Sequence, residues 1–419
     1  MKVLVVGGGG REHTIVWKIN QSPLIDKIYC APGNGGIARL AECVNIGATD
    51  IEGIVAFCEQ QKIDLAVVAP DDPLVIGMVD ALEEKGIRAF GPNKKAAIIE
   101  GSKVFSKDLM KKYNIPTAGY EVFEDSEKAI AYLKTVSFPT VVKAEGLALG
   151  KGVIIADNYE QAVSAVKDIM QDKKFGEAGN RVVIEEFLVG PEVSVLSFTD
   201  GNTIVPMVSA QDHKRAYDND EGLNTGGMGT FTPSRIYTKE IADYCMAHVF
   251  KPTMHAMKSE GRKFKGILYF GLILTKDGVK VLEYNARFGD PETQVVLPRL
   301  KTDLVEIMQA IIDEKLDSVD ISWKDSAAVC VVMASGGYPL SYQKGYPIVG
   351  IAEAESMEGV TVFHAGTKCE NNEVVTAGGR VLGVTALGKD LDDAITRSYE
   401  AVRKISFTDA HYRKDIGIK

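Results

Sequence analysis

The 419-residue chain lacks paired cysteines, long apolar runs and blocks of basic residues. None of its six cysteines belongs to a Cys-x-x-Cys pair or stands beside a histidine cluster, so we expect free, mostly buried thiols. Nowhere do eighteen apolar residues run together, and the apolar run Val3–Val6 is too short for a signal peptide. We therefore expect a protein of the reducing cytoplasm that makes no membrane contact.

The net charge of −9 is spread over the chain without a basic block, which disfavours nucleic acid and an anionic membrane surface as partners. Small anionic ligands would then need local cationic pockets. The length allows about three domains, each with its own core. Because no heptad run or long exposed apolar helix is evident, we expect a monomer.

The glycine run Gly7–Gly10 does not complete the dinucleotide pattern G-x-G-x-x-G. Counted from Gly7 the last place is Glu12, and counted from Gly8 it is His13. The acidic residue that would bind the ribose is also missing, so an NAD-linked oxidoreductase is disfavoured. A row of backbone N–H groups followed by Arg11 still suits a phosphate cradle, and the alternative is a tight turn without a ligand.

The first hundred residues alternate between predicted strands and helices, which predicts a parallel, Rossmann-like sheet with crossover helices. Such sheets bind ligands in the loops that follow their strands. The predicted strands are Val3–Val6, Lys27–Cys30 and Leu65–Val68, and the predicted helices are Arg11–Gln21, Ile51–Gln61 and Leu74–Lys85.

Two predicted strands, Thr140–Lys143 and Gly152–Ala156, are joined by the glycine-rich loop Ala144–Lys151. The loop is not a Walker sequence, because its glycines are one residue too close and Gly152 stands where Ser or Thr would hold Mg²⁺. We interpret it as a flexible flap over phosphates, with Lys151 at its tip; the alternative is an ordinary mobile hairpin. The helix before it should start at Ser102 as N-cap, and a further helix is predicted over 124–135.

The polar stretch Gln211–Gly229 shows little periodicity and mixes cations, acids and glycines. A structureless loop of this length is either functional or disordered, and its composition favours function. Within it we expect His213 to be a surface imidazole rather than a general base. The apolar strand Ala327–Met333 then opens what should be a separate small α/β domain.

Five ionisable or amide groups follow the apolar run Val279–Leu282 within ten residues. Glu283 and Asn285 are two apart on a predicted strand and therefore point to the same face. Two oxygen ligands on one face suit Mg²⁺, which completes its shell with water and nucleotide phosphates. Arg287 continues this face and can grip a carboxylate or phosphate with two hydrogen bonds. The alternative is a strand end with solvated charges.

Taken together, these segments resemble one family in order and spacing over essentially the whole chain. That family is glycinamide ribonucleotide synthetase, also called phosphoribosylamine–glycine ligase, in the ATP-grasp superfamily. Its most specific element here is Arg287-Phe288-Gly289-Asp290-Pro291-Glu292. Other matching segments are Gly7–His13, Gly101–Lys103, Glu185–Glu192, Asp212–Arg215, Gly226–Gly229, Ser335–Pro339 and His364–Thr367.

The resemblance implies a multi-domain α/β ATP-grasp fold. Its parts would be a Rossmann-like domain over 1–101, an ATP-grasp domain over 102–326 with a mobile lid at about 118–190, and a small α/β domain over 327–419. The implied reaction joins glycine to 5-phosphoribosylamine through glycyl phosphate, giving glycinamide ribonucleotide, ADP and phosphate in purine biosynthesis. Phosphoryl transfer needs positioning and charge neutralisation, so the lack of an evident protein nucleophile is expected.

The resemblance also implies roles for single residues around ATP and Mg²⁺ or Mn²⁺. Lys103 and Lys143 would hold the phosphates under the flap, and Glu283 and Asn285 would bind the metal. Glu185 and Leu188 would flank the adenine, and Glu192 would accept from the ribose hydroxyls. The full ATP set is Lys103, Lys143, Gly150, Lys151, Gly152, Glu185, Glu186, Leu188 and Glu192.

For the other substrates, Arg287 would hold the glycine carboxylate and Asp290 the glycine ammonium, and both are the implied catalytic residues. Phosphoribosylamine would be received by Gly8, Gly9, Gly10, Asp71, Asp212, Lys214, Gly226, Gly227 and Gly229. Two features depart from the expected pattern. Asp71 stands where the longer Glu is expected, and Glu283 is the single clear carboxylate at the metal.

Two other functions share many of these residues. Another ATP-grasp carboxylate–amine ligase or a carboxylase would keep the nucleotide residues and differ around Asp212 and Asp290. A non-catalytic nucleotide sensor would close its hairpin on ATP without glycine-dependent release of ADP.

Overall fold

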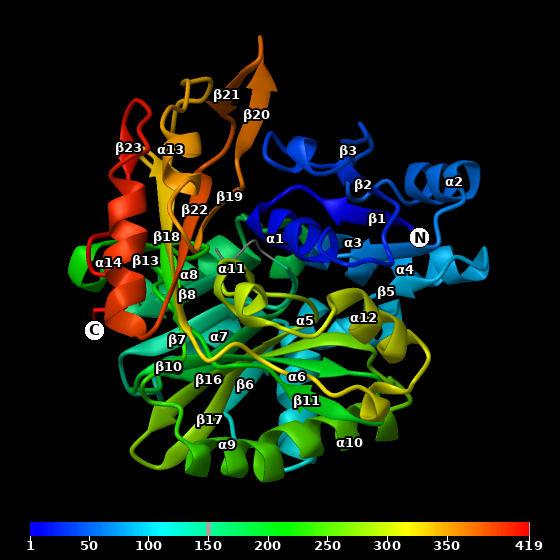
Figure 1. Cartoon of the computed structure of the whole chain (residues 1–419). Helices are drawn as coiled ribbons and strands as arrows, with labels where there is room; N and C mark the ends of the chain where they lie inside the picture. The colour runs from blue at the N-terminus through cyan, green and yellow to red at the C-terminus, as the bar shows by residue number, and fades with distance from the viewer. Residues whose placement is uncertain (148–151, 419) are drawn as a thin grey trace.

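The computed structural model describes residues 1–147 and 152–418 (Figure 1). Its first part is a five-stranded parallel sheet in the order β3-β2-β1-β4-β5, which confirms the predicted alternation. Strand β1 is apolar and almost wholly buried because helices cover both faces of a parallel sheet. The strands are β1 (Lys2–Gly7), β2 (Lys27–Pro32), β3 (Glu42–Cys43), β4 (Leu65–Val68) and β5 (Ala89–Phe90).

The crossover helices are α1 (Gly10–Ile19), α2 (Ile51–Gln61), α3 (Asp71–Ile76) and α4 (Met78–Glu84). The single helix predicted over 74–85 was wrong. Gly77 adopts φ +100° and divides it into α3 and α4, because a left-handed residue cannot continue a right-handed helix. Helix α3 begins at Asp71, so this residue opens a helix instead of lying in the preceding loop.

The hairpin region forms a four-stranded sheet in the order β6-β9-β7-β8, with helices α7 (Ser126–Tyr132) and α8 (Tyr159–Met170) and its own apolar core. Its strands are β6 (Tyr120–Phe123), β7 (Thr140–Ala144), β8 (Val153–Ala156) and β9 (Val182–Glu186). Antiparallel pairing of β7 with β8 matches the predicted hairpin. Helix α7 is shorter than the predicted 124–135, since Asp125 caps it by accepting from Lys128 N.

Helix α5 (Lys94–Gly101) runs directly into α6 (Lys103–Lys112), and Ser102 caps α6 as predicted by accepting from Phe105 N at 3.1 Å. A second four-stranded sheet, in the order β11-β10-β16-β17, lies below in Figure 1. It contains β10 (Glu192–Thr199), β11 (Ile204–Pro206), β16 (Gly266–Thr275) and β17 (Gly278–Asn285).

One face of this sheet is covered by α9 (Lys239–Cys245), the π-helical turn η4 (Met246–Phe250) and α10 (Lys251–Ser259), which run along the bottom of Figure 1. On the other face, α12 (Leu304–Ile312) joins it to the parallel sheet in one core, in which Phe198 and Ile307 are buried with Val5. The short helix α11 (Thr293–Val296) contributes Val295 and Val296 to the same core.

The last sheet has the order β12-β15-β18-β22-β19, with β23 (Ala410–His411) also paired to β18. Its strands β12 (Gln211–Asp212) and β15 (Gly229–Thr232) precede residue 327, so the sheet crosses the expected boundary of a separate small domain. The other elements are β18 (Ala327–Ser335), β19 (Val360–His364), β22 (Arg380–Gly388), α13 (Ile351–Glu355), α14 (Leu391–Val402) and the hairpin β20 (Thr367–Glu370) with β21 (Glu373–Thr376).

The stretch Gln211–Gly229 is not structureless. Besides β12 it forms a hairpin of β13 (Arg215–Tyr217) and β14 (Glu221–Asn224), joined by the turn η3 (Asp218–Asp220). The sequence pattern did not predict this hairpin because most of its residues are polar and face solvent. Strands β13 and β14 therefore lack the alternation of apolar and polar residues that indicates a half-buried strand.

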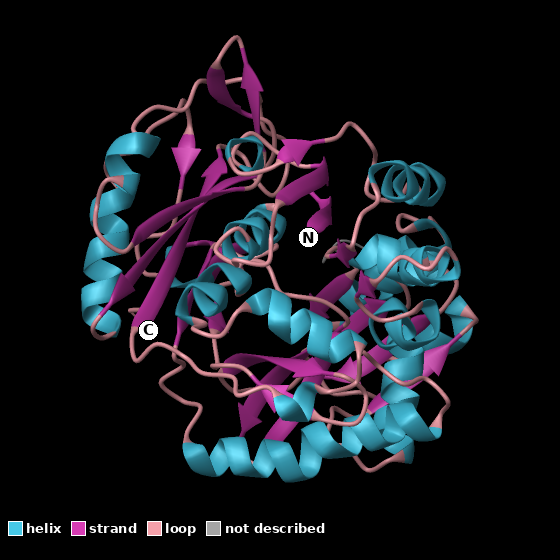
Figure 2. Cartoon of the chain, turned by 45° about the vertical axis from the view of Figure 1, so that its right-hand side comes forward, coloured by secondary structure: helices cyan, strands magenta, loops and turns pink. Residues whose placement is uncertain are grey.

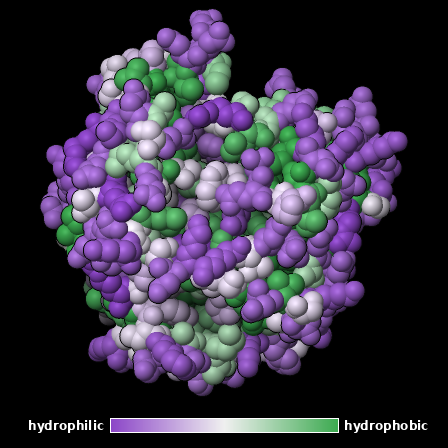
Figure 3. Space-filling model, in the orientation of Figure 1, coloured by the Kyte–Doolittle hydropathy of each residue, from purple (hydrophilic) through white to green (hydrophobic). Residues whose placement is uncertain are grey.

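The surface is mostly polar, with apolar residues in scattered spots on the face shown in Figure 3. Figure 2 shows helices at the left, at the right and along the bottom of the molecule, with strands and further helices between them. In residues 1–147 and 152–418 no helix is long and apolar enough to cross a membrane. All six cysteines are free; four are buried and two, Cys43 and Cys369, are exposed.

Candidate active site

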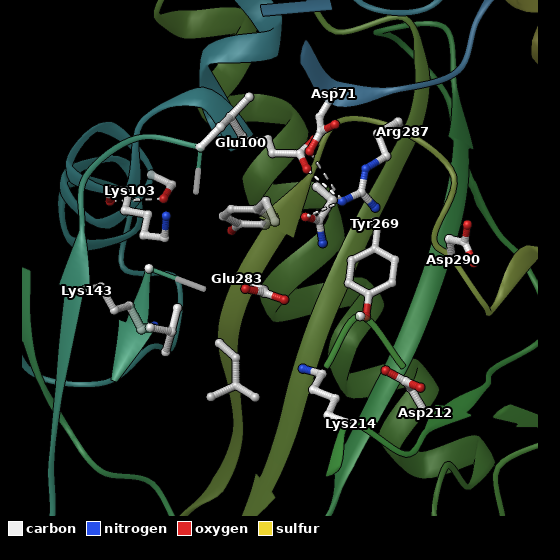
Figure 4. Close-up of a pocket in the computed structure, with 18 of the residues that line it drawn as sticks. Asp71, Glu100, Lys103, Lys143, Asp212, Lys214, Tyr269, Glu283, Arg287 and Asp290 are labelled. Carbon is white, nitrogen blue, oxygen red and sulfur yellow. Dashed lines mark hydrogen bonds and ion pairs between the residues drawn. The ribbon is translucent and has the colours of Figure 1, made fainter. Parts of the chain in front are cut away.

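Side chains from every part of the fold line one cavity of about 410 Å³ (Figure 4). More than half of them are charged, and both cations and carboxylates are present. The lining residues used below are Arg11, Asp71, Glu100, Lys103, Lys107, Lys143, Gly152, Glu185, Asp212, Lys214, Asn224, Thr225, Gly226, Tyr269, Leu282, Glu283, Asn285, Arg287, Asp290, Glu292 and Arg380.

Glu185 binds two lysines at one end of the cavity. Its Oε2 lies 2.9 Å from Lys143 Nζ and 2.9 Å from Lys107 Nζ, while Oε1 has no partner in the described structure. Burial acts to raise the pKa of Glu185, but Lys143 and Lys107 outweigh it and hold the pKa below its usual value. Burial lowers the pKa of Lys107 to about 8 despite this partner. Lys107 was not predicted, because its separation from Glu185 along the chain hides the pairing.

Lys103 stands in the first turn of α6 and donates from Nζ to Gly146 O at 2.8 Å. The base of the glycine loop is held by Glu145, which accepts from Ser102 Oγ at 2.9 Å and is paired with Arg181. Lys103 and Lys143 therefore lie on the same side of the cavity, as Figure 4 shows. Gly152 lines the cavity as well, whereas the predicted site residues Gly150 and Lys151 lie outside the described residues.

Of the residues predicted to bind adenine and ribose, only Glu185 is in the cavity lining described above. Glu186 is exposed and faces Gly119 N at 3.3 Å, away from the cavity wall. Leu188 is buried in a small apolar cluster with Leu282, which does line the cavity. Glu192, predicted for the ribose, accepts from Lys214 Nζ at 3.0 Å.

Glu283 and Asn285 both line the cavity from β17, as strand alternation predicted. A β-bulge opposite Gly271 brings Leu282 to the wall as well. Burial acts to raise the pKa of Glu283, but Lys214, Lys143, Lys103 and Arg287 together hold it below the usual value. Four cations therefore stabilise the negative charge of the Glu283 carboxylate.

Arg287 is fixed by carboxylates on both sides. Its Nη2 lies 2.9 Å from Glu100 Oε1 and 3.9 Å from Asp71 Oδ2, and it donates to Asn285 Oδ1 at 3.2 Å. Glu100 also accepts from Ala286 N at 2.7 Å. Burial raises the pKa of Glu100 to about 7, and Arg287 opposes that rise.

Sequence reasoning missed Glu100. The available signal was an acid at the end of the apolar run Ala96–Ile99 in α5, where a solvated charge would not be placed.

Asp290 is surrounded by donors. It accepts from Arg11 N at 3.3 Å and from Gln294 Nε2 at 2.9 Å, and Oδ1 lies 3.4 Å from Arg380 Nη1. Arg380 also donates to Gly226 O at 2.6 Å, so it connects β22 to the predicted substrate loop. Arg380 was missed too; its one signal was a cation directly after the pair Gly378-Gly379.

The glycine loop at the start of α1 lies behind the wall, since Gly8, Gly9 and Gly10 are not among the lining residues described. A Cβ at Gly8 would lie 2.4 Å from Gly33 O, so the backbones pack directly on each other. Gly9 N already donates to Glu12 Oε2 at 2.6 Å. The adjacent Arg11 does reach the cavity.

The stretch Gln211–Gly229 supplies Asp212, Lys214 and Gly226 to the cavity wall. Gly227 lies against them, because a Cβ there would be 2.7 Å from Asp212 Oδ1. Gly229 instead belongs to β15 and packs on Ile416. Burial, then Glu292, raises the pKa of Asp212 well above its usual value.

The expectation that His213 is a surface imidazole was wrong. It is 8% exposed beside Phe231, and burial lowers its pKa to about 4. Its backbone pairs with Gly229 and Met228, so the strand pairing turns the ring inward.

Known protein families account for nearly the whole chain. Residues 1–100 match the family described as phosphoribosylglycinamide synthetase, N domain. Residues 101–293 match its ATP-grasp (A) domain and residues 328–419 its C domain. The chain belongs to the phosphoribosylglycinamide synthetase family. It is therefore an ATP-dependent ligase with an ATP-grasp fold, as the sequence resemblance predicted.

Relatives and solved structures agree with this assignment. Phosphoribosylamine–glycine ligases of Caldanaerobacter subterraneus subsp. tengcongensis and Clostridium acetobutylicum are each 49% identical to the chain. The matches cover 99% of this chain and 99% of the first relative, and 100% and 99% for the second. The crystal structure of phosphoribosylamine–glycine ligase from Thermotoga maritima has a TM-score of 0.87 at 32% identity, covering 99% of this chain and 100% of that one.

Biotin carboxylase from Campylobacter jejuni shares the fold, with a TM-score of 0.77 at 14% identity over 100% of this chain and 94% of that one.

Proposed function

We propose that the chain joins glycine to 5-phosphoribosylamine at the expense of ATP, giving glycinamide ribonucleotide, ADP and phosphate in purine biosynthesis. The observation that carries this proposal is the charged cavity in a chain that matches the family over residues 1–293 and 328–419. Four cations, Lys103, Lys143, Lys214 and Arg287, surround Glu283 in it. Such a site can neutralise a triphosphate and a carboxylate at once.

The phosphates of ATP belong at Lys103 and Lys143. Lys143 is held by Glu185 at 2.9 Å and Lys103 by Gly146 O at 2.8 Å, so both ammonium groups are positioned before ATP binds. Positioned charge costs no reorganisation when the γ-phosphoryl group moves to the glycine carboxylate oxygen and ADP leaves. The product of that step is glycyl phosphate.

Arg287 and Asp290 belong to the glycine and acyl phosphate side. The guanidinium of Arg287 is oriented by Glu100 and Asn285, and its buried Nε has no acceptor in the described structure. That unused donor can bind a carboxylate or acyl phosphate oxygen. The amine nitrogen of phosphoribosylamine then attacks the carbonyl carbon, the C–O bond to phosphate breaks with its electrons on phosphate, and the nitrogen loses one proton to solvent.

Glu283 and Asn285 fit a divalent cation. Their oxygens share one wall, and the Glu283 carboxylate accepts no hydrogen bond within the described chain. No group of three or more His, Cys, Asp or Glu side chains in residues 1–147 and 152–418 is arranged to hold a metal. A two-ligand site suits Mg²⁺ or Mn²⁺, which takes its other ligands from water and phosphates and would neutralise phosphate charge.

The proposal keeps the other predicted assignments. Adenine and ribose would lie near Leu188 and Glu192. Glu185 and Glu186 would contribute from strand β9, and the flap would contribute Gly150, Lys151 and Gly152. Phosphoribosylamine would meet the segment from Asp212 to Gly229, with Asp71 beside Arg287. The loop of Gly8, Gly9 and Gly10 lies behind the wall and would contribute through the adjacent Arg11. We also propose a monomer that works in the cytoplasm.

The test is ADP release by the purified protein with Mg-ATP, glycine and phosphoribosylamine made in place from ribose 5-phosphate and ammonia. Each component is omitted in turn. We expect release to require all of them and to equal glycinamide ribonucleotide formed. The variant Lys103→Met should lose this turnover, whereas Lys112→Met, at the exposed end of the same helix, should keep it.

ATP consumption that ignores glycine or phosphoribosylamine would contradict the proposed acceptor and favour another carboxylate–amine ligase. ATP binding without any turnover would favour a nucleotide sensor.

A further inference from the structure

The hairpin Arg215–Asn224 joins two parts of the cavity wall. Lys214 precedes it and Thr225 follows it, and both line the cavity. Thr225 closes the base of the hairpin, because its N and Oγ1 each donate to Lys214 O at 2.8 Å. The conformation of the hairpin therefore sets where these wall residues stand.

The outer end of this hairpin is held by the C-terminal segment 411–415. Arg413 is 0% exposed and donates from Nε and Nη2 to Asp415 at 2.8 and 2.7 Å. Its Nη1 donates to Asp220 Oδ1 at 2.9 Å and to Arg215 O at 3.2 Å. Arg413 thus contacts the first residue of β13 through a backbone acceptor and the last residue of the turn η3 through a charged acceptor.

Backbone bonds reinforce this contact. Lys414 N donates to Asp218 Oδ1 at 2.7 Å, and Asn219 N donates to Asp415 Oδ2 at 2.9 Å. The ring of His411 lies 2.7 Å from Ala216 O through Nε2. Every residue of the turn η3 is therefore held by the C-terminal segment.

Packing holds only part of the hairpin, at Ala216 of β13, which is 1% exposed. All of β14 is exposed, and an isolated two-stranded hairpin is marginally stable in water. Asn219 and Asp220 adopt φ of 61° and 58°, in the left-handed region that Asn and Asp tolerate better than most non-glycine residues but that still disfavours an L side chain. The buried guanidinium constrains Asp220 in this conformation.

We propose that Arg413 is a positioning residue for the second substrate, acting through the Arg215–Asn224 hairpin. Figure 4 shows Lys214 and Asp212 on the side of the cavity away from Lys103 and Lys143. Lys214 also pairs with Glu192, which is proposed for the ATP ribose, so misplacing the hairpin should weaken binding of ATP slightly. Binding of phosphoribosylamine should weaken more, because Asn224, Thr225 and Gly226 of its wall move with the hairpin. The identity of that substrate rests on the proposed function; the contact between Arg413 and the hairpin does not.

Two variants test the proposal together with a matched control. Arg413→Lys keeps the charge and loses the forked hydrogen bonds. Asp220→Asn removes the charge of one acceptor, whose side chain is 57% exposed, and keeps a residue type that tolerates the left-handed conformation of this position. The control Arg397→Ala breaks a partly exposed ion pair to Asp393 on α14, and neither residue is in the cavity lining. For the parent protein and each variant, the rate of trypsin cleavage after Lys214 and Arg215 is measured under native conditions, together with steady-state kinetics.

Both variants should be cut faster at these two sites and show KM for phosphoribosylamine raised about tenfold, with KM for ATP changed less than about twofold. The control should match the parent protein. Unchanged cleavage overturns the contact, and faster cleavage with unchanged kinetics overturns the positioning role. Equal changes in both KM values indicate general damage and also overturn it. If the parent protein shows no turnover with phosphoribosylamine, the proposed function fails, and cleavage alone still decides whether Arg413 holds the hairpin.

Discussion

Replacing Glu185 with Gln should loosen the hairpin sheet while leaving its size and shape unchanged. The carboxylate is 3% exposed and lies 2.9 Å from the ammonium groups of Lys107 and Lys143. Removing one partner of a buried ion pair leaves uncompensated charge and costs about 3–5 kcal/mol. We expect about 3 kcal/mol, because Lys107 can lose its proton at modest cost.

The pH dependence of that cost follows from Lys107. Burial lowers its pKa in the folded state to about 8, below the ordinary value of 10.5. The unfolded state therefore binds more protons between these values, and this group makes the folded state more stable as pH rises through that window. Without Glu185 the pKa of Lys107 in the folded state falls further, and each pKa unit of that fall lowers the unfolding free energy at neutral pH by about 1.4 kcal/mol. Well above pH 8 Lys107 is neutral in the folded state of both the parent protein and Glu185→Gln. It then no longer contributes to the difference in unfolding free energy between them.

Hydrogen exchange measured by mass spectrometry provides the assay. At pH 7, peptides covering β7 and β9 should exchange roughly a hundredfold faster in Glu185→Gln than in the parent protein, since about 1.4 kcal/mol is tenfold. At pH 9 the difference should shrink. Peptides covering β18 should be unaffected.

The control is Glu186→Gln, the exposed neighbour on the same strand, which should change exchange by less than about twofold. A Glu185→Gln protein that exchanges like this control, or one whose excess is equal at both pH values, would refute the reasoning.

Three further predictions concern the cavity. Asp290→Asn should raise KM for glycine about tenfold and leave KM for ATP nearly unchanged; equal effects in steady-state assays would count against its role. Glu283→Gln should lower kcat at saturating Mg-ATP by about a hundredfold or more, and unchanged turnover would exclude it as a metal ligand. The pKa of Glu100 is raised from 4.5 to about 7, so the folded state binds more protons in this window and loses stability as pH rises through it, by about 3 kcal/mol. Glu100→Gln should flatten that decline in denaturant unfolding at pH 5 and 8, and an identical decline would contradict it.

Much of the fold follows from local pattern. Alternating apolar strands and amphipathic helices predicted the parallel sheet, and the hairpin around the glycine loop was predicted from two short apolar runs. Strand alternation also placed Glu283 and Asn285 on one face. These features were predictable because each depends on residues next to one another in the chain.

Other features escaped because their signal is not local. The polar hairpin β13–β14 carries no apolar alternation, and His213 is buried by packing against Phe231. Gly77 divided a helix that periodicity predicted as continuous, since a single left-handed residue outweighs a pattern of side chains.

The sequence by itself determined which elements form and which residue types the site contains. The tertiary structure decided which charges balance one another: Glu100 meets Arg287, Arg380 meets Asp290, and Lys107 meets Glu185 across different sheets and helices. The physical reason is that backbone periodicity is set by neighbours along the chain, whereas the energy of a buried charge depends on whichever partner packing brings within hydrogen-bond distance.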